Sequence, residues 1–111
     1  MVSDMNTDEH DKLREVVRRL VEVYSPEQIY LFGSTARGDS DEDSDLDIMV
    51  VVSDATPEPL RSAGRAYQAL WGVGVAVDVL IWTRSAFDAR LHLNASLPAT
   101  IVREGRLLHA A

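Results

Sequence analysis

Two apolar runs rich in β-branched residues constrain the fold of this chain more than any other feature. The first, DLDIMVVV, covers residues 45–52, and the second, VAVDVLIW, covers residues 75–82. Runs of this length and composition are typical of strands buried in a sheet. Residues 60–71, between them, have helical character, and strands that alternate with helices favour a two-layer α/β domain. We therefore predict a mixed β-sheet with helices packed on one face.

The rest of the chain continues this alternation of helices and strands. Apolar residues recur at helical spacing up to Tyr24, which predicts a helix that begins near Asn6 and ends at the Ser25-Pro26 pair. The further predicted elements are a strand over residues 29–32, a turn over residues 72–74, a helix over residues 85–95 capped by Ser85 with Asp88 at its N3 position, a short helix after Pro98 and an edge strand over residues 106–109.

Length and cysteine content limit what the chain can be. Its 111 residues leave no room for a second core, so we expect a single domain over residues 1–111. The sequence contains no cysteine, which excludes disulfides, zinc–thiolate sites and cysteine nucleophiles. The same absence favours a reducing compartment, and we expect a cytoplasmic protein.

Charge and hydropathy exclude further classes of protein. No stretch approaches the roughly 20 apolar residues of a membrane span, and the first ten residues are polar and acidic, unlike a signal peptide. We therefore expect no association with membranes. The net charge of −7 argues against direct binding of nucleic acid, and it suits a protein that holds cations or docks on a basic partner.

The glycine-containing acidic stretch between the first two predicted strands fits neither of two familiar loops. Gly33 and Gly38 are spaced as in a P-loop, but Asp39 occupies the place of the lysine and would repel phosphates. An EF-hand would need glycine at Ser44 and glutamate at Val50. The simplest interpretation of most of the acidic residues is a solvated loop; these residues are Asp39, Asp41, Glu42 and Asp43.

Asp45 and Asp47 fit that interpretation less well. They stand two residues apart where an apolar strand begins, so their side chains should point to the same face of the sheet. Two carboxylates side by side repel each other at the edge of a core. A divalent cation between them removes this conflict, and Mg²⁺ commonly binds one or two carboxylates together with phosphate oxygens and water.

Asp78 is the one charged residue in the run VAVDVLIW. A lone aspartate is disfavoured in a strand and costly to bury without a partner. It could be bonded to an arginine or a backbone amide, or it could serve a metal or a reaction. If the two strands are neighbours, it converges with Asp45 and Asp47, and two metal ions roughly 3.5–4 Å apart could hold a phosphoryl group in transfer.

Gly33 and Ser34 follow the short strand that precedes the acidic stretch. Glycine allows the backbone to approach a phosphate closely, and the hydroxyl and the amides that follow it can donate hydrogen bonds. Such a pair occurs in many ordinary turns, so alone it indicates little. Arg37 could contact a phosphate or form a salt bridge with the acidic loop.

Taken together, Gly33-Ser34, Asp45-Leu46-Asp47 and Asp78 resemble the signature of DNA polymerase β-type nucleotidyltransferases. The longer string LFGSTARGDSDEDSDLDIMV resembles the minimal nucleotidyltransferase (MNT, MntA-like) proteins of prokaryotes. This resemblance covers most of the chain. It implies the two-layer α+β nucleotidyltransferase fold and transfer of AMP from ATP with two Mg²⁺ ions.

Position by position, the resemblance also implies roles for the motif residues. Gly33 and Ser34 would bind the triphosphate, Asp45 and Asp47 would ligate Mg²⁺, and Asp78 would be the third carboxylate and the base. Every position of the motif is filled. The expected function is therefore that of an active nucleotidyltransferase.

The resemblance further implies a partner. MNT proteins are antitoxins of HEPN-domain ribonuclease toxins, so we expect a hetero-oligomer in which AMP is transferred to a tyrosine of the toxin. Two alternatives are an antitoxin that neutralises its toxin by binding alone and a nucleotidyltransferase of small, aminoglycoside-like molecules. The chain has no room for a domain that would hold a small acceptor by itself.

A few other residues carry weaker signals. The three histidines, His10, His92 and His109, lie far apart in sequence and predict surface or packing roles rather than a metal site. Trp71 and Trp82 could stack on a nucleobase, although aromatic residues at the ends of elements more often pack in a core or an interface. Arg61 and Arg65 share one face of the predicted helix, which is either solvated or a docking surface.

Overall fold

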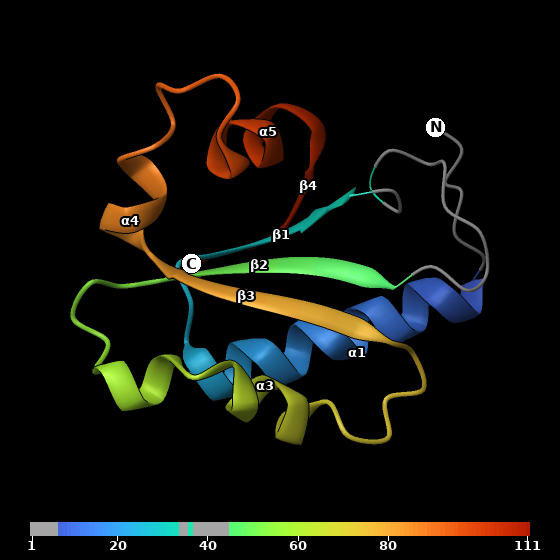
Figure 1. Ribbon diagram of the computed structural model, residues 1–111. Coiled ribbons are helices and arrows are strands. Elements are labelled where there is room, and N and C mark those ends of the chain that lie inside the picture. The colour runs from blue at the N-terminus through green and yellow to red at the C-terminus, as the bar shows by residue number, and fades with distance from the viewer. Residues whose placement is uncertain (1–6, 34–35, 37–44) are drawn as a thin grey trace.

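The computed structural model describes residues 7–33, 36 and 45–111, and Figure 1 shows helices arranged around a β-sheet. The elements follow one another as a long helix, two strands, a helical connection, a third strand, two short helices and a last strand. No helix within these residues combines the length and the apolar character needed to cross a membrane.

The sheet has four strands in the order β3-β2-β1-β4. They are β1 (Gln28–Phe32), β2 (Leu46–Val52), β3 (Val77–Thr83) and β4 (Arg106–Ala110). β1 is antiparallel to both β2 and β4, whereas β2 is parallel to β3. The predicted mixed sheet and the edge strand near residue 106 are therefore confirmed, and the two apolar runs of the sequence are neighbours.

Helices α1 (Thr7–Tyr24) and α3 (Ala63–Ala69) cover one face of the sheet, which lies above them in Figure 1. The apolar stripe of α1 causes this packing, because it places Leu13, Val16 and Leu20 against the sheet. From the strands, Ile29, Ile48 and Val50 and their neighbours on the same face complete the main core. The Tyr24 hydroxyl donates a hydrogen bond of 2.6 Å to the Ser62 carbonyl, which attaches the end of α1 to the start of α3.

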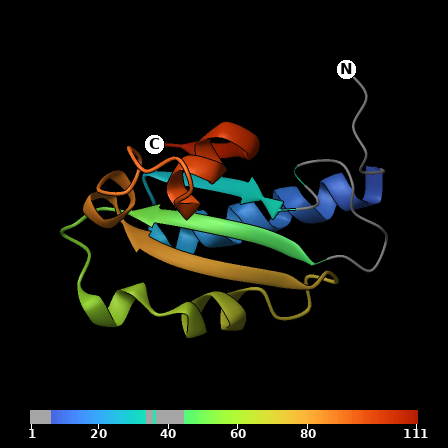
Figure 2. The same cartoon turned by 45° about the horizontal axis from the view of Figure 1, so that its top comes forward.

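The opposite face carries two short helices, α4 (Arg84–Asp88) and α5 (Leu97–Glu104), as Figure 2 shows from above. Phe87 and Ile101 from these helices bury Met49 and Val51 of β2 in a second, smaller core. This layer was not part of the sequence prediction, which placed the helices on one face. Because α4 and α5 are short, they cover only part of the sheet.

The connection between β2 and β3 differs from the continuous helix predicted over residues 60–71. A 3₁₀ turn, η1 (Glu58–Arg61), comes first, and α3 begins after Ser62. Ser62 is extended, and its side chain accepts a hydrogen bond from the Gly64 amide, so it caps a new helix. The serine therefore divides the predicted helix in two.

The helix predicted over residues 85–95 also ends early, at Asp88. Its cap is Thr83 rather than Ser85, because the Thr83 hydroxyl accepts the hydrogen bond from the Ala86 amide. After Asp88 the amides of Arg90, Leu91 and Leu93 each donate to the carbonyl three residues earlier, which produces successive tight turns.

Candidate active site

One end of the sheet brings together three of the motif segments singled out in the sequence. β1 runs toward this end and β2 and β3 run away from it, because β1 is antiparallel to β2 and β2 is parallel to β3. Gly33 therefore follows the last residue of β1 where Asp45 precedes the first residue of β2. Asp47 and Asp78 are the second residues of their strands.

Asp47 and Asp78 are register partners in the parallel pair β2–β3. Neighbouring strands lie roughly 4.8 Å apart, and partners in a pleated sheet point to the same face. On its other side Asp47 is opposite Phe32 of β1. The sequence prediction that these two aspartates share one face of neighbouring strands is therefore confirmed.

Both carboxylates lie on the face that carries α4 and α5, since Ile48 and Val79, the residues that follow them, belong to the core under α1. The short helices stop before this end of the sheet. Asp78 is exposed, and Leu80, two residues further along the same face, keeps 39% of its surface accessible. The side chain of Asp78 has no hydrogen bond or ion pair within the part of the chain that the structure describes, so the alternative of an aspartate bonded to arginine or an amide is not observed there.

Gly33 packs directly against the Asp47 side chain. Its φ angle is +77°, in the left-handed region, which glycine adopts most readily. A Cβ atom at this position would collide with Oδ2 of Asp47 and stand 3.2 Å from its Cγ. Two separate requirements, the backbone angle and the missing side chain, therefore demand glycine where β1 ends.

Asp45 directly precedes β2, and the Leu46 amide donates a 3.0 Å hydrogen bond to the Ala76 carbonyl, which sets the start of β2 against the segment that leads into β3. The three aspartates are nevertheless not gathered into a compact set of ligands. Within residues 7–33, 36 and 45–111, no three histidine, aspartate or glutamate side chains lie close enough together to hold a metal ion. Ser34 and Arg37, the other predicted phosphate contacts, lie outside the described residues.

Comparisons with known proteins agree with this geometry. The family model of the nucleotidyltransferase domain matches residues 10–108, which is nearly the whole chain. The chain belongs to this family. A proposed protein adenylyltransferase of Methanocaldococcus jannaschii is 30% identical over 103 residues, which cover 91% of this chain and 98% of that protein. The chain is therefore a nucleotidyltransferase enzyme.

Solved structures show the same fold as this nucleotidyltransferase. A toxin–antitoxin structure with AMP-PNP has a TM-score of 0.61 at 23% identity, covering 88% of this chain and 73% of the other. A nucleotidyltransferase from Sulfolobus solfataricus has a TM-score of 0.59 at 21% identity, covering 96% and 89%. A mutant of the toxin–antitoxin pair MntA–HpeT has a TM-score of 0.59 at 20% identity, covering 88% and 73%.

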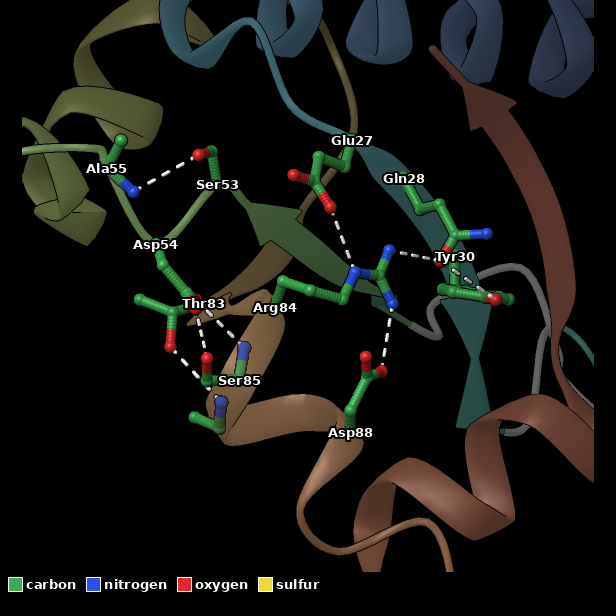
Figure 3. Close-up of polar contacts among 11 residues, drawn as sticks. Glu27, Gln28, Tyr30, Ser53, Asp54, Ala55, Thr83, Arg84, Ser85 and Asp88 are labelled. Carbon is green, nitrogen blue, oxygen red and sulfur yellow. Dashed lines mark hydrogen bonds and ion pairs between the residues drawn. The ribbon is translucent and has the colours of Figure 1, made fainter.

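The other end of the nucleotidyltransferase sheet holds a polar network of a different kind, drawn in Figure 3. Arg84, where β3 meets α4, donates to Glu27 at 2.9 Å, to Gln28 at 2.7 Å and to Asp88 at 3.0 Å. Beside it, both the hydroxyl and the backbone amide of Ser85 donate to the Asp54 carboxylate. The hydroxyl contact, helped by the amide, lowers the pKa of Asp54 below its ordinary range. No local pattern in the sequence indicates this network, because Glu27, Gln28 and Asp54 lie far along the chain from Arg84 and Ser85.

The structure also shows where the tryptophans and the two arginines of the predicted helix lie. Trp82 packs against the smaller core, whereas Trp71 is 87% exposed at the end of α3. Arg61 and Arg65 are half-buried and bonded to backbone carbonyls: Arg61 donates to that of Thr56 and Arg65 to those of Leu60 and Val23. Both arginines therefore hold the connection around η1 in place.

Proposed function

We propose that this nucleotidyltransferase transfers AMP from ATP to a hydroxyl group of a protein, with Asp45, Asp47 and Asp78 as its functional carboxylates. The observation that carries the proposal is the register of β2 and β3, which sets Asp47 beside Asp78 on the same face of the sheet. The name of the M. jannaschii relative, which is similar over almost its full length, supports a protein as the acceptor.

The residues present fit magnesium as the metal. Aspartate carboxylates are hard oxygen ligands, and Mg²⁺ usually takes only one or two of them and fills its remaining positions with phosphate oxygens and water. Asp47 and Asp78, which are register partners on one face, could offer two such oxygen ligands to the ion. Asp45 and Asp47 would hold it, together with Asp78; when bound, magnesium neutralises phosphate charge and lowers the pKa of the attacking hydroxyl.

Other residues, on or beside the strands, would bind the triphosphate and receive the acceptor. Gly33 brings the backbone at the end of β1 directly against Asp47, so a phosphate bound at Gly33 would lie beside that carboxylate. Asp78, exposed on the edge strand β3, faces the side from which an acceptor can enter. Ser34 would donate its hydroxyl to the phosphates, and Arg37 would contact them.

The reaction then balances as an in-line displacement. The acceptor oxygen forms a bond to the α-phosphorus of ATP, and the bond between that phosphorus and the oxygen bridging to the β-phosphate breaks. Pyrophosphate leaves with the bonding electrons. The proton of the acceptor hydroxyl would pass to the Asp78 carboxylate, which is on the same face as Asp47.

We further propose that the acceptor is a HEPN-domain toxin, modified on a tyrosine, and that the two chains form a toxin–antitoxin pair. The likeness of fold to toxin–antitoxin structures and to one with AMP-PNP supports this choice. The motif resemblance of the stretch from Gly33 to Asp47 points in the same direction.

The test uses ATP labelled on the α-phosphate, Mg²⁺ and the purified toxin encoded beside this chain. Label should appear on a toxin tyrosine, and Asp47→Asn or Asp78→Asn should remove it. Asp11→Asn, an exposed aspartate on α1, is the matched control and should label normally. Persistent labelling by the Asp47→Asn variant would reject the assignment of the site. Rescue of cells by unlabelled complexes alone would favour neutralisation by binding, and label on an antibiotic would favour a small acceptor.

A further inference from the structure

A groove of about 470 Å³ lies between α1 and β4, on the side of the sheet opposite the aspartates. Its floor is apolar and consists of Leu13, Val17 and Val21 from α1 and Leu108 from β4. Leu13 is buried by the sheet, but Val17 and Val21 belong to a second stripe that the fold covers only in part. The apolar surface of α1 is therefore wider than its own sheet requires. We call this surface the α1–β4 groove.

The rim of the α1–β4 groove is basic although the whole chain is acidic. Arg14, Arg18 and Arg106 line it together with the imidazoles of His10 and His109, and none of the described lining residues is acidic. The chain as a whole carries a net charge of −7. The groove therefore has the opposite sign to the rest of the molecule.

Two of these arginines have charges that no described residue compensates. Arg18 pairs with Glu15 at 2.7 Å and with Glu22 at 3.1 Å, so its charge is used within α1. Arg14 and Arg106 make no ion pair with any residue in the described part of the chain. They stand on different elements, one on each side of the apolar floor, and both are exposed.

The shape of the groove fits a segment of polypeptide better than a compact ligand. The residues that α1 contributes run from His10 to Val21, which spans roughly 16 Å along the helix axis. Apolar residues at this spacing, flanked by charge, are the surface to which amphipathic segments bind. A segment with apolar side chains on one side and carboxylates beside them would match both the floor and the rim.

We propose that the α1–β4 groove binds an acidic, amphipathic segment of a partner protein, whose carboxylates pair with Arg14 and Arg106. Charge complementarity selects this occupant, because a symmetric pair of these chains would set arginine against arginine in the same groove. Nucleic acid would meet the field of an acidic protein. The inference is independent of the catalytic proposal, since groove and aspartates lie on opposite faces of the sheet.

The experiment uses two designed helical peptides with the same leucines at i, i+3, i+4 and i+7. One carries glutamate beside the leucines, and the other carries lysine in the same places. Their dissociation constants for the full-length protein are measured by fluorescence anisotropy, and amide chemical shifts locate the site. We expect the glutamate peptide to bind in the groove and the lysine peptide to bind roughly tenfold or more weakly.

Charge reversal makes the test specific. In Arg14→Glu/Arg106→Glu the preference should invert, so that the lysine peptide binds more tightly, and Arg14→Gln/Arg106→Gln should bind neither peptide selectively. Arg90→Glu/Arg103→Glu changes the net charge equally, on exposed residues outside the groove, and should keep the original preference. Asp47→Asn should also leave peptide binding unchanged.

Each other outcome overturns the proposal. Three such outcomes are a lack of saturable binding of the glutamate peptide, chemical-shift changes that map outside the groove, and an equal loss of peptide preference in the control variant. Self-association of the unmodified protein that the groove variant abolishes would assign the groove to a second copy. Binding of anionic vesicles or of an oligonucleotide that depends on Arg14 and Arg106 would assign it to those partners instead.

Discussion

Both ends of the sheet carry charged side chains, but the charges are arranged in opposite ways. At the end where β3 meets α4, Arg84 lies between Glu27 and Asp88 and forms an ion pair with each. At the other end, Asp47 and Asp78 stand in register on neighbouring strands, like charge beside like charge. The first arrangement stabilises the fold. The second arrangement, two carboxylates on one face, is common where a protein binds a cation or a charged substrate.

Removal of one carboxylate at the aspartate end should have the largest effect on activity. We expect Asp47→Asn to lower the rate of AMP transfer on the order of 10³-fold, because the proposed ligand of Mg²⁺ would act on charge that develops in the transition state. The free energy of unfolding should change little, because asparagine has nearly the same size and shape as aspartate. Single-turnover transfer and urea unfolding measure the two quantities. A variant that is inactive because it is unfolded would contradict this comparison.

Gly33→Ala tests the same end through the backbone. A Cβ atom would meet Asp47 Oδ2, and alanine would be strained at a φ angle of +77°. The left-handed conformation alone costs about 1–2 kcal/mol, so the variant should be less stable by at least that amount. Activity should fall roughly 10- to 100-fold because the Asp47 carboxylate moves.

Gly72→Ala is the matched control for that variant. Gly72 also has a positive φ angle, of +80°, but a Cβ atom there meets nothing within 4 Å. It should lose a similar amount of stability and little activity. Equal losses of activity in both variants would show that strain alone, and not the contact with Asp47, is responsible.

Arg84→Leu tests the opposite end. Ion pairs as exposed as these contribute up to about 1 kcal/mol each, and this substitution leaves Glu27 and Asp88 without their common partner. We expect the free energy of unfolding to fall by up to about 2 kcal/mol, with the transfer rate unchanged within a factor of about two, because the site lies at the other end of the sheet. Thermal unfolding measures the change in stability, and transfer assays measure the change in rate. Arg90→Leu, at an exposed arginine without such a network, should be close to neutral.

The same contrast explains which features the sequence could predict. Local patterns are sufficient for α1, β2 and β3, because helical spacing in one segment and β-branched runs in the others leave little choice. Asp78 was conspicuous since a charge is rare in such a run. That Asp47 and Asp78 are partners, however, depends on the register of two strands, which the Leu46–Ala76 hydrogen bond helps to fix and which no local pattern encodes.

Contacts between residues far apart in the chain could not be predicted from the sequence for the same reason. Arg84 meets Glu27 and Gln28 only because β1 and β3 flank β2, so nothing beside Arg84 in the chain indicates the network. Leu91 and Leu93 extended an apparent helix beyond Asp88, yet both are exposed in tight turns. His10 and His109 seemed unrelated in the sequence, and the pairing of β4 with β1 places both in one groove.

The smallest change that we expect is in the titration of Asp54. Hydrogen-bond donors within the fold stabilise the ionised form of this carboxylate. The Ser85 hydroxyl and amide lower its pKa, so the ionised form is favoured in the folded protein. The stability that this contributes is present above the ordinary aspartate pKa of about 3.9 and is lost as the pH falls through the lower, folded value. In Ser85→Ala the pKa of Asp54 should rise toward its ordinary value, although the remaining amide bond should hold it somewhat lower. Carboxyl chemical shifts followed from pH 6 to pH 2 measure this pKa directly.

Ser53→Ala is the control, because it removes a hydroxyl that is bonded to the Ala55 amide instead. It should leave the titration of Asp54 unchanged. An equal rise of the Asp54 pKa in this control would mean that the loop, and not the Ser85 hydroxyl, sets the pKa.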